Sequence, residues 1–104
     1  MKLLSLLVAA AALVTPVLSQ AADPKLYRSE PETVFCTSKL SAKSFQLYMR
    51  QKDVAAAGSV IQSGGCSIVT PSVELFIESE DDGVVGVRRK GLTSVVWTFR
   101  HMLR

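Results

Sequence analysis

The residues best suited to chemistry in this chain are its two cysteines, Cys36 and Cys66. They do not have the CxxC spacing of a redox or zinc site, and the single histidine, His101, is distant from both in the sequence. In an oxidising compartment, two such cysteines form a structural disulfide. Closing a loop of about 30 residues would stabilise the fold by about 3.5 kcal/mol. We therefore predict a Cys36–Cys66 disulfide.

Catalytic residues are scarce. A Ser–His–acid triad would have to use His101, near the C-terminus, and neither a G-x-S-x-G motif nor a second histidine is present. The acids between Glu78 and Asp82 follow the start of a calcium-binding loop, but Arg89 stands where that loop needs a bidentate glutamate. We expect no enzyme activity, no cofactor and no bound metal. Activity lost on substitution of His101 would contradict this expectation.

Basic residues gather towards the C-terminus, close to aromatic ones. Five acids lie between Glu74 and Asp82, and five bases lie between Arg88 and Arg104. A separation of charge of this kind favours docking to an acidic protein surface over nucleic acid, although a solvated rim is the simpler alternative. Phe76 lies out of phase with the apolar residues around it and is expected to be exposed. The predicted partner-binding surface consists of Phe76, Arg88, Arg89, Lys90 and Arg100.

The first 21 residues have the features of a secretory signal peptide. Lys2 supplies the positive charge, an apolar run follows, Pro16 breaks the helix, and Ser19-Gln20-Ala21 is a small-residue cleavage site. The short, alanine-rich leader is typical of bacteria and predicts a periplasmic or secreted protein, with membrane contact only through this segment. A retained membrane anchor is the alternative.

Cleavage after Ala21 would leave one small domain. Of the 104 residues, 83 would remain, and the formal charge would fall from +3 to +2 because Lys2 is lost. This charge is too small to indicate nucleic-acid binding. Residues 22–35 carry two prolines and mixed charge without an apolar period, so we expect a flexible arm there, with order at Val34-Phe35 as the chain approaches Cys36. Residues 36–104 form the predicted disulfide-stapled domain.

Between the cysteines the apolar spacing is helical. Phe45 and Met49 lie on one face of a helix over residues 42–51. Asp53 can cap a second helix, VAAAGSVIQSG, which Gly64 ends. The two helices predict a short αα-hairpin whose ends the disulfide joins.

After Cys66 the pattern changes to strands. Residues 67–70 form a short strand, and residues 73–99 alternate in three runs separated by Asp82-Gly83 and Lys90-Gly91 turns. The fold class is therefore α+β: the αα-hairpin followed by a small antiparallel β-meander, or an SH3-like barrel, of about four strands.

The alternation also predicts which residues face the core. We expect one face to be apolar and the other to be solvated. The core face comprises Val85, Val87, Val95, Trp97 and Phe99, and the solvent face comprises Arg88, Lys90, Thr98 and Arg100.

Two segments carry a resemblance to a known family. DGVVGVR (82–88) and VWT (96–98) resemble the final strands of SH3-like domains in exported bacterial proteins, where a V-x-V-R strand precedes a glycine turn and a strand with tryptophan. The resemblance implies binding of peptides or cell-wall components through an aromatic groove. This chain has one tryptophan and no tandem repeat, so the ligand does not carry over. The order of helices and strands is also similar to that of small outer-membrane assembly lipoproteins, whose lipidation cysteine is absent.

These observations predict that the protein functions by binding a partner. We expect a non-enzymatic, exported bacterial envelope adaptor or accessory protein that binds an acidic envelope protein or a cell-wall component. The alternative is a small exported toxin or inhibitor, such as those carried by conjugative plasmids or phages.

Overall fold

The computed structural model describes residues 25–104, so the predicted leader and its cleavage site lie outside the described residues. Within that range the chain is α+β, as predicted. Six strands, two α-helices and a short 3-10 helix follow one another as β1 (Tyr27–Arg28), β2 (Thr33–Cys36), α2 (Lys39–Arg50), α3 (Val54–Gln62), β3 (Cys66–Val69), β4 (Glu74–Asp81), β5 (Val84–Arg89), β6 (Val95–Phe99) and η1 (Arg100–Met102). Neither described helix is long and apolar enough to cross a membrane.

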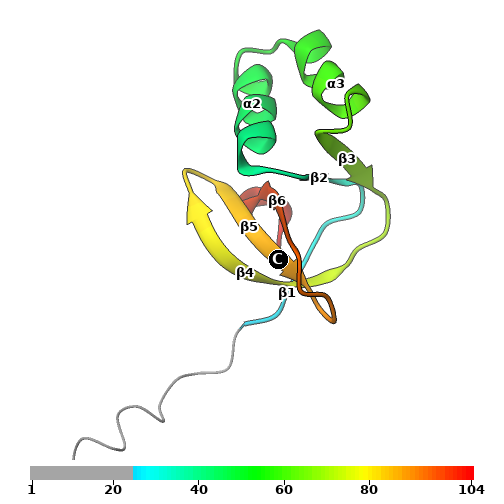
Figure 1. Cartoon of the computed structure of the whole chain (residues 1–104), viewed down its shortest axis with the longest axis vertical. Coiled ribbons are helices and arrows are strands. Elements are labelled where there is room, and N and C mark those ends of the chain that lie inside the picture. The colour runs from blue at the N-terminus through cyan, green and yellow to red at the C-terminus, as the bar shows by residue number, and fades with distance from the viewer. Residues whose placement is uncertain (1–24) are drawn as a thin grey trace, which may run out of the picture.

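The six strands form one open antiparallel sheet in the order β1-β4-β5-β6-β2-β3 (Figure 1). Only residues 29–32 join β1 to β2, although these strands are four positions apart in the sheet. A flat sheet would separate them by about 19 Å, and the connection can span at most about 17 Å. The sheet is therefore curled, and an antiparallel bridge between Ser29 and Leu103 links the first strand region to the C-terminus.

The predicted meander is confirmed as β4, β5 and β6. Asp82 and Gly83 join the first two strands with positive φ angles of 52° and 84°. Both residues are therefore left-handed, which is the conformation of a two-residue type I′ hairpin turn and suits an Asp-Gly pair. The register shifts between Ile77 and Ser79, so β4 contains one irregularity opposite β5.

The αα-hairpin is confirmed, and α2 begins at Lys39, three residues before the predicted start. The Ser38 side chain accepts a hydrogen bond from the Ser41 amide at 3.1 Å, which fixes the start of α2. Asp53 caps α3 in the same way by accepting from the Ala56 amide at 3.1 Å. Both helices lie over one end of the sheet (Figure 1).

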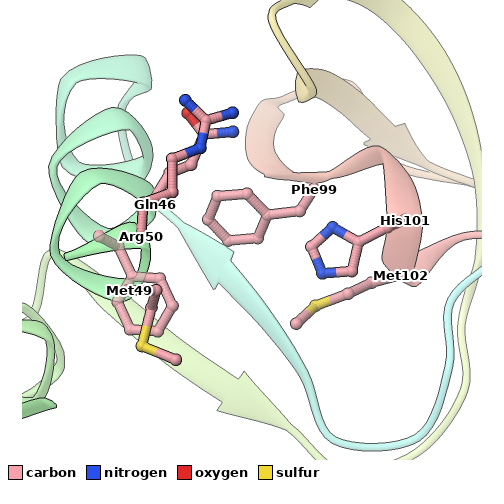
Figure 2. Close-up of a pocket in the computed structure, with 7 residues that line it drawn as sticks. Gln46, Met49, Arg50, Phe99, His101 and Met102 are labelled. Atoms are coloured by element: carbon pink, nitrogen blue, oxygen red, sulfur yellow. The ribbon is translucent and has the colours of Figure 1, made fainter. Parts of the chain in front are cut away.

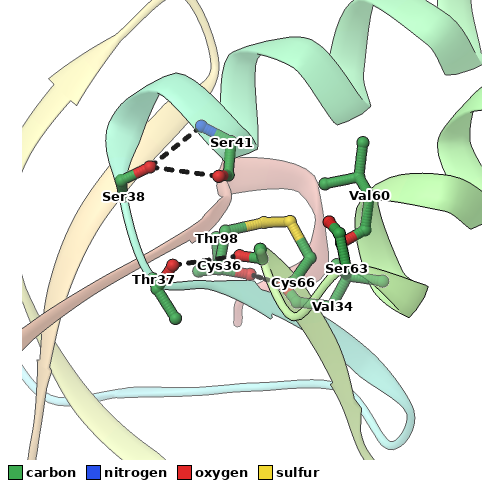
Figure 3. Close-up of a disulfide and its surroundings, with 10 residues drawn as sticks. Val34, Cys36, Thr37, Ser38, Ser41, Val60, Ser63, Cys66 and Thr98 are labelled. Atoms are coloured by element: carbon green, nitrogen blue, oxygen red, sulfur yellow. Dashed lines mark hydrogen bonds between the residues drawn. A yellow bond between two sulfur atoms is a disulfide. The ribbon is translucent and has the colours of Figure 1, made fainter.

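The predicted Cys36–Cys66 disulfide is present, with an S–S distance of 2.03 Å (Figure 3). The two cysteines are direct neighbours across β2 and β3, and both are buried. Because α2 and α3 lie between them in sequence, the bridge closes the helical hairpin at the point where it leaves the sheet.

Both faces of the sheet are packed, which corrects the predicted division into a core face and a solvent face. Val85 and Val87 pack with Leu75 inside the curl, whereas Phe99 packs on the opposite face under the helices, where the half-buried Trp97 joins it. Thr98, which the alternation places on the solvent face, is 0% exposed. Its hydroxyl donates to the Val34 carbonyl at 2.7 Å, which satisfies this buried polar group. The sheet therefore has a core on each face.

In the described part of the predicted arm, the order extends beyond Val34-Phe35, because Tyr27–Arg28 form β1. Residues 33–36 form a strand that is buried at every position. Val34 joins the core beneath the helices, and Phe35 joins the core inside the curl. A strand buried on both faces has no alternation to recognise, so its four residues could not be distinguished from a loop. The folded domain therefore begins before Cys36.

Candidate protein-interaction surfaces

The five residues of the predicted partner-binding surface do not all lie together, because Arg100 is separated from the other four. Phe76 and Arg88 are cross-strand neighbours on β4 and β5. Arg89 is the exposed last residue of β5, and Lys90 begins the exposed turn that follows. The amide of Arg100 donates to the Gly83 carbonyl at the other end of β5. The predicted surface is therefore divided between the two ends of the meander.

The predicted separation of acids and bases is also lost in the fold, because β4 and β5 are neighbouring strands. The Arg88 side chain donates to Glu78 at 3.2 Å. Glu74 lies 3.5 Å from Lys90 and 3.1 Å from Arg28. These surface pairs are partly screened by water and add little stability. They do, however, neutralise much of the charge that was expected to attract an acidic partner.

Phe76, Arg88 and Trp97 share the sheet face that also carries the helices. The Arg88 guanidinium lies 4.9 Å from the centre of the Phe76 ring, in a cation–π contact. On β6, Val95 lies opposite Arg88, and Trp97 lies opposite Gly86. The amine of Lys39, at the start of α2, is 6.0 Å from the Trp97 ring. Half-buried aromatic rings and paired cations thus occupy the part of this face beyond α2.

A concave site lies elsewhere, between the C-terminal half of α2 and η1. This groove has a volume of about 310 Å³ and is lined by Phe45, Gln46, Met49, Arg50, Phe99, His101 and Met102 (Figure 2). Its floor is aromatic: the rings of Phe45 and Phe99 have centroids 5.8 Å apart. Met49, on α2, is 49% exposed, which is unusual for a methionine next to a core.

Polar groups stand at the edge of the groove. Arg50 pairs with Asp82 at 3.4 Å, and the Gln46 amide donates to the Asp82 carbonyl at 3.0 Å. The β4–β5 turn therefore holds one side of the groove in place. His101 is exposed on the other side, with its ring 6.1 Å from that of Phe99.

The groove was missed by sequence reasoning for two reasons. Phe45 and Met49 were assigned to the buried face of a helix, and Phe99 was assigned to the core of a strand. Each assignment is locally reasonable, because Phe45 and Phe99 are buried. No local pattern shows that the last turn of α2 and the residues after β6 pack side by side, since that contact depends on the curl of the sheet.

Among the ionisable side chains of residues 25–104, three have clearly shifted pKa values, and all three are in surface pairs. Hydrogen bonds from Lys39 and Lys43 of α2 lower the pKa of Asp81 below its ordinary value. The hydrogen bond from Arg104 lowers the pKa of Glu30, and the same pair raises the pKa of Arg104. None of these groups lines the groove, so the shifts mark ion pairs that hold α2 and the C-terminus to the sheet.

Within residues 25–104, no three His, Cys, Asp or Glu side chains are grouped so that they could hold a metal ion. Comparison with protein-family models gives no match, and neither curated proteins nor solved structures yield a significant match.

Proposed function

We propose that this chain is an exported bacterial envelope adaptor or accessory protein that works by protein–protein contact and not by catalysis. The observation that carries the proposal is the aromatic and methionine-lined groove between α2 and η1. The leader predicted in the sequence and the Cys36–Cys66 disulfide, which is compatible with an oxidising compartment, support the export.

The groove has the properties of a pocket for one anchoring side chain of a partner. Its volume of about 310 Å³ is at the lower end for small-ligand sites and suits a single apolar side chain. Buried anchors of this kind supply most of the affinity of many interfaces. Met49 and Met102 are flexible and polarisable, so they can adapt to an aliphatic or aromatic group.

The charges around the groove favour an acidic partner. Arg50 and His101 lie at its edge, and Arg100 belongs to η1. The charge of Arg50 is shared with Asp82, so attraction would depend mainly on Arg100 and on the net positive charge of the chain. We therefore propose an acidic envelope protein as the partner, with a cell-wall component as the competing ligand class.

The finer architecture is part of the same proposal. The curl of the sheet and the Ser29–Leu103 bridge support an SH3-like barrel closed incompletely between β1 and the C-terminus. In such a barrel, Phe76 and Trp97 would form a second contact surface together with Arg88. Arg89, at the end of β5, and Lys90, in the turn after it, would set the association rate more than the affinity.

Site-specific photo-crosslinking in living bacteria tests the groove. The full chain, including its leader, would carry a photoreactive amino acid at position 49. A discrete crosslinked product is expected that disappears in Met102→Lys, which places a charge inside the groove. Leu92→Lys is the matched control, because Leu92 is exposed in the β5–β6 turn. A product that survives Met102→Lys would show that the groove is not the binding site.

Two further measurements separate the partner classes. Association with an acidic protein should weaken as salt is raised, and substitution of Arg100 by Glu should slow it. A crosslinked product that contains glycan strands would instead assign the groove to the cell wall. Growth arrest on export of the wild-type chain, relieved by Met102→Lys, would identify a toxin or inhibitor that uses the same groove.

A further inference from the structure

The two edges of the sheet differ. At one edge, β1 is covered by the C-terminal residues: the amide of Arg28 donates to the Arg104 carbonyl at 2.9 Å, and the amide of Arg104 donates to the Arg28 carbonyl at 2.9 Å. At the other edge, β3 pairs only with β2 among the described strands (Figure 1). The outer side of β3 is therefore the open edge of this sheet.

The register shows which backbone groups of β3 point outwards. Phe35 lies opposite Ser67, and Val34 lies opposite Ile68. Just beyond the strand, the Thr37 amide donates to the Gly65 carbonyl at 2.9 Å. Hydrogen-bonded and non-bonded positions alternate along an antiparallel pair, so Ser67 faces β2 and Ile68 faces away. The amide and carbonyl of Ile68 are therefore directed out of the sheet, towards a potential further strand.

The segment that forms this edge carries no charge of its own, although Glu32 lies beside it, with its amide donating to the Thr70 carbonyl at 3.0 Å. The residues from Val54 to Val73, which include all of α3 and β3, contain no Asp, Glu, Lys, Arg or His. Ile68 is 54% exposed and Val54 is 70% exposed. Open edges of soluble proteins are often protected by lysines, inward-pointing charges or bulges, and β3 has none of these, although its length of four residues limits the pairing.

We infer that β3 pairs with β3 of a second copy of this chain, antiparallel and about a two-fold axis at Ile68. In that arrangement the two Ile68 residues exchange both backbone hydrogen bonds, and Cys66 lies opposite Thr70 of the other copy. The pairing gives hydrogen-bond partners to the outward amide and carbonyl of Ile68 in both copies. It also joins the two sheets into one continuous sheet.

Charge complementarity favours a second copy over an unrelated acidic or basic partner. The chain carries a small net positive charge, so two copies repel each other weakly over most of their surfaces. The α3–β3 surface is the neutral exception, and two such surfaces meet without repulsion. The α3–β3 segment offers a charged partner no residue of opposite charge. The β3 strand of a second copy is uncharged and can pair with β3 of the first.

The test is the oligomeric state of the exported, oxidised protein as a function of concentration. Light scattering and sedimentation should show a dimer that dissociates on dilution. Ile68→Lys would place two lysines at the two-fold axis and should raise the dimer dissociation constant at least about tenfold. Leu92→Lys adds the same charge in the β5–β6 turn, and it should leave the dimer unchanged.

Hydrogen exchange provides a readout that does not depend on a variant. Protection of the Ile68 amide should increase with protein concentration, whereas protection of the Val85 amide inside the sheet should not. If Ile68→Lys does not fold, Ser67→Lys, at a second exposed position of the same edge, replaces it. A monomer at all concentrations, or a dimer that Ile68→Lys and Ser67→Lys leave intact, would overturn the inference.

Discussion

Gly86 and Trp97 lie opposite each other on β5 and β6, and their contact leads to a quantitative prediction. A methyl group added at Gly86 would meet the Trp97 ring, with carbon–carbon distances of 2.9 and 3.0 Å, and the Ser79 hydroxyl oxygen at 2.8 Å. Real contacts of this kind are essentially never shorter than 3.0 Å. The Trp97 ring can therefore lie across β5 only because residue 86 has no side chain.

The size of the effect follows from two opposing contributions. Alanine in a strand is favoured over glycine by about 0.5–1 kcal/mol, because the unfolded chain loses less freedom. Forcing an extra methyl group into a packed site costs about 1–3 kcal/mol. Gly86→Ala should therefore lower the free energy of unfolding by about 0.5–2 kcal/mol. For a domain of this size, 1 kcal/mol corresponds to a melting temperature lower by about 4–8 °C.

A double-mutant cycle with Trp97→Val isolates the contact. Valine lacks the six-membered ring whose atoms approach Gly86, and the Ser79 hydroxyl can turn to another rotamer. Gly86→Ala in that background should therefore be neutral or stabilising. The coupling between the two positions should be about 1–3 kcal/mol. Urea unfolding followed by far-UV circular dichroism measures all four proteins with one probe. An equal cost of Gly86→Ala in both backgrounds would refute the role of the Trp97 ring.

Three other predictions concern the contacts that hold the layers together. Reduction of the Cys36–Cys66 bridge should lower the free energy of unfolding by about 3–4 kcal/mol, and alkylation of the oxidised protein should add no mass. Thr98→Val should cost about 1–3 kcal/mol in urea unfolding, because the Val34 carbonyl loses its buried donor. The lowered pKa of Asp81 stabilises the fold above the ordinary value of 3.8, and this contribution is lost as the pH falls through the folded value. Asp81→Asn should therefore melt at a lower temperature than the wild type at pH 7, and the two melting temperatures should converge near pH 2.

The elements that could be predicted are those whose local chemistry is strong. The Asp82-Gly83 turn, the Asp53 cap and the alternation of β4 each leave a local signature, and all three are present. The Cys36–Cys66 disulfide could be predicted because the leader indicates an oxidising compartment and the sequence has two cysteines. In each case the deciding contact lies within a few residues or is covalent.

The features that could not be predicted depend on residues that are distant in sequence. Phe35 and Val34 are adjacent and face two different cores, so β2 shows no alternation. The ion pair between Arg88 and Glu78 exists because β4 and β5 are neighbours, whereas their charges were considered separately in the sequence. The groove depends on the position of η1 relative to α2, which the curled sheet sets. Tertiary packing determined each of these outcomes.

The pairing of Arg28 with Arg104 has a practical consequence for engineering. The chain enters and leaves the described fold at adjacent points, because the backbones of these two residues exchange hydrogen bonds. A domain with neighbouring ends can be spliced into a surface loop of a host protein without stretching that loop. The same proximity permits circular permutation, with the old ends joined by a short glycine linker and new ends opened in the exposed β5–β6 turn at Leu92.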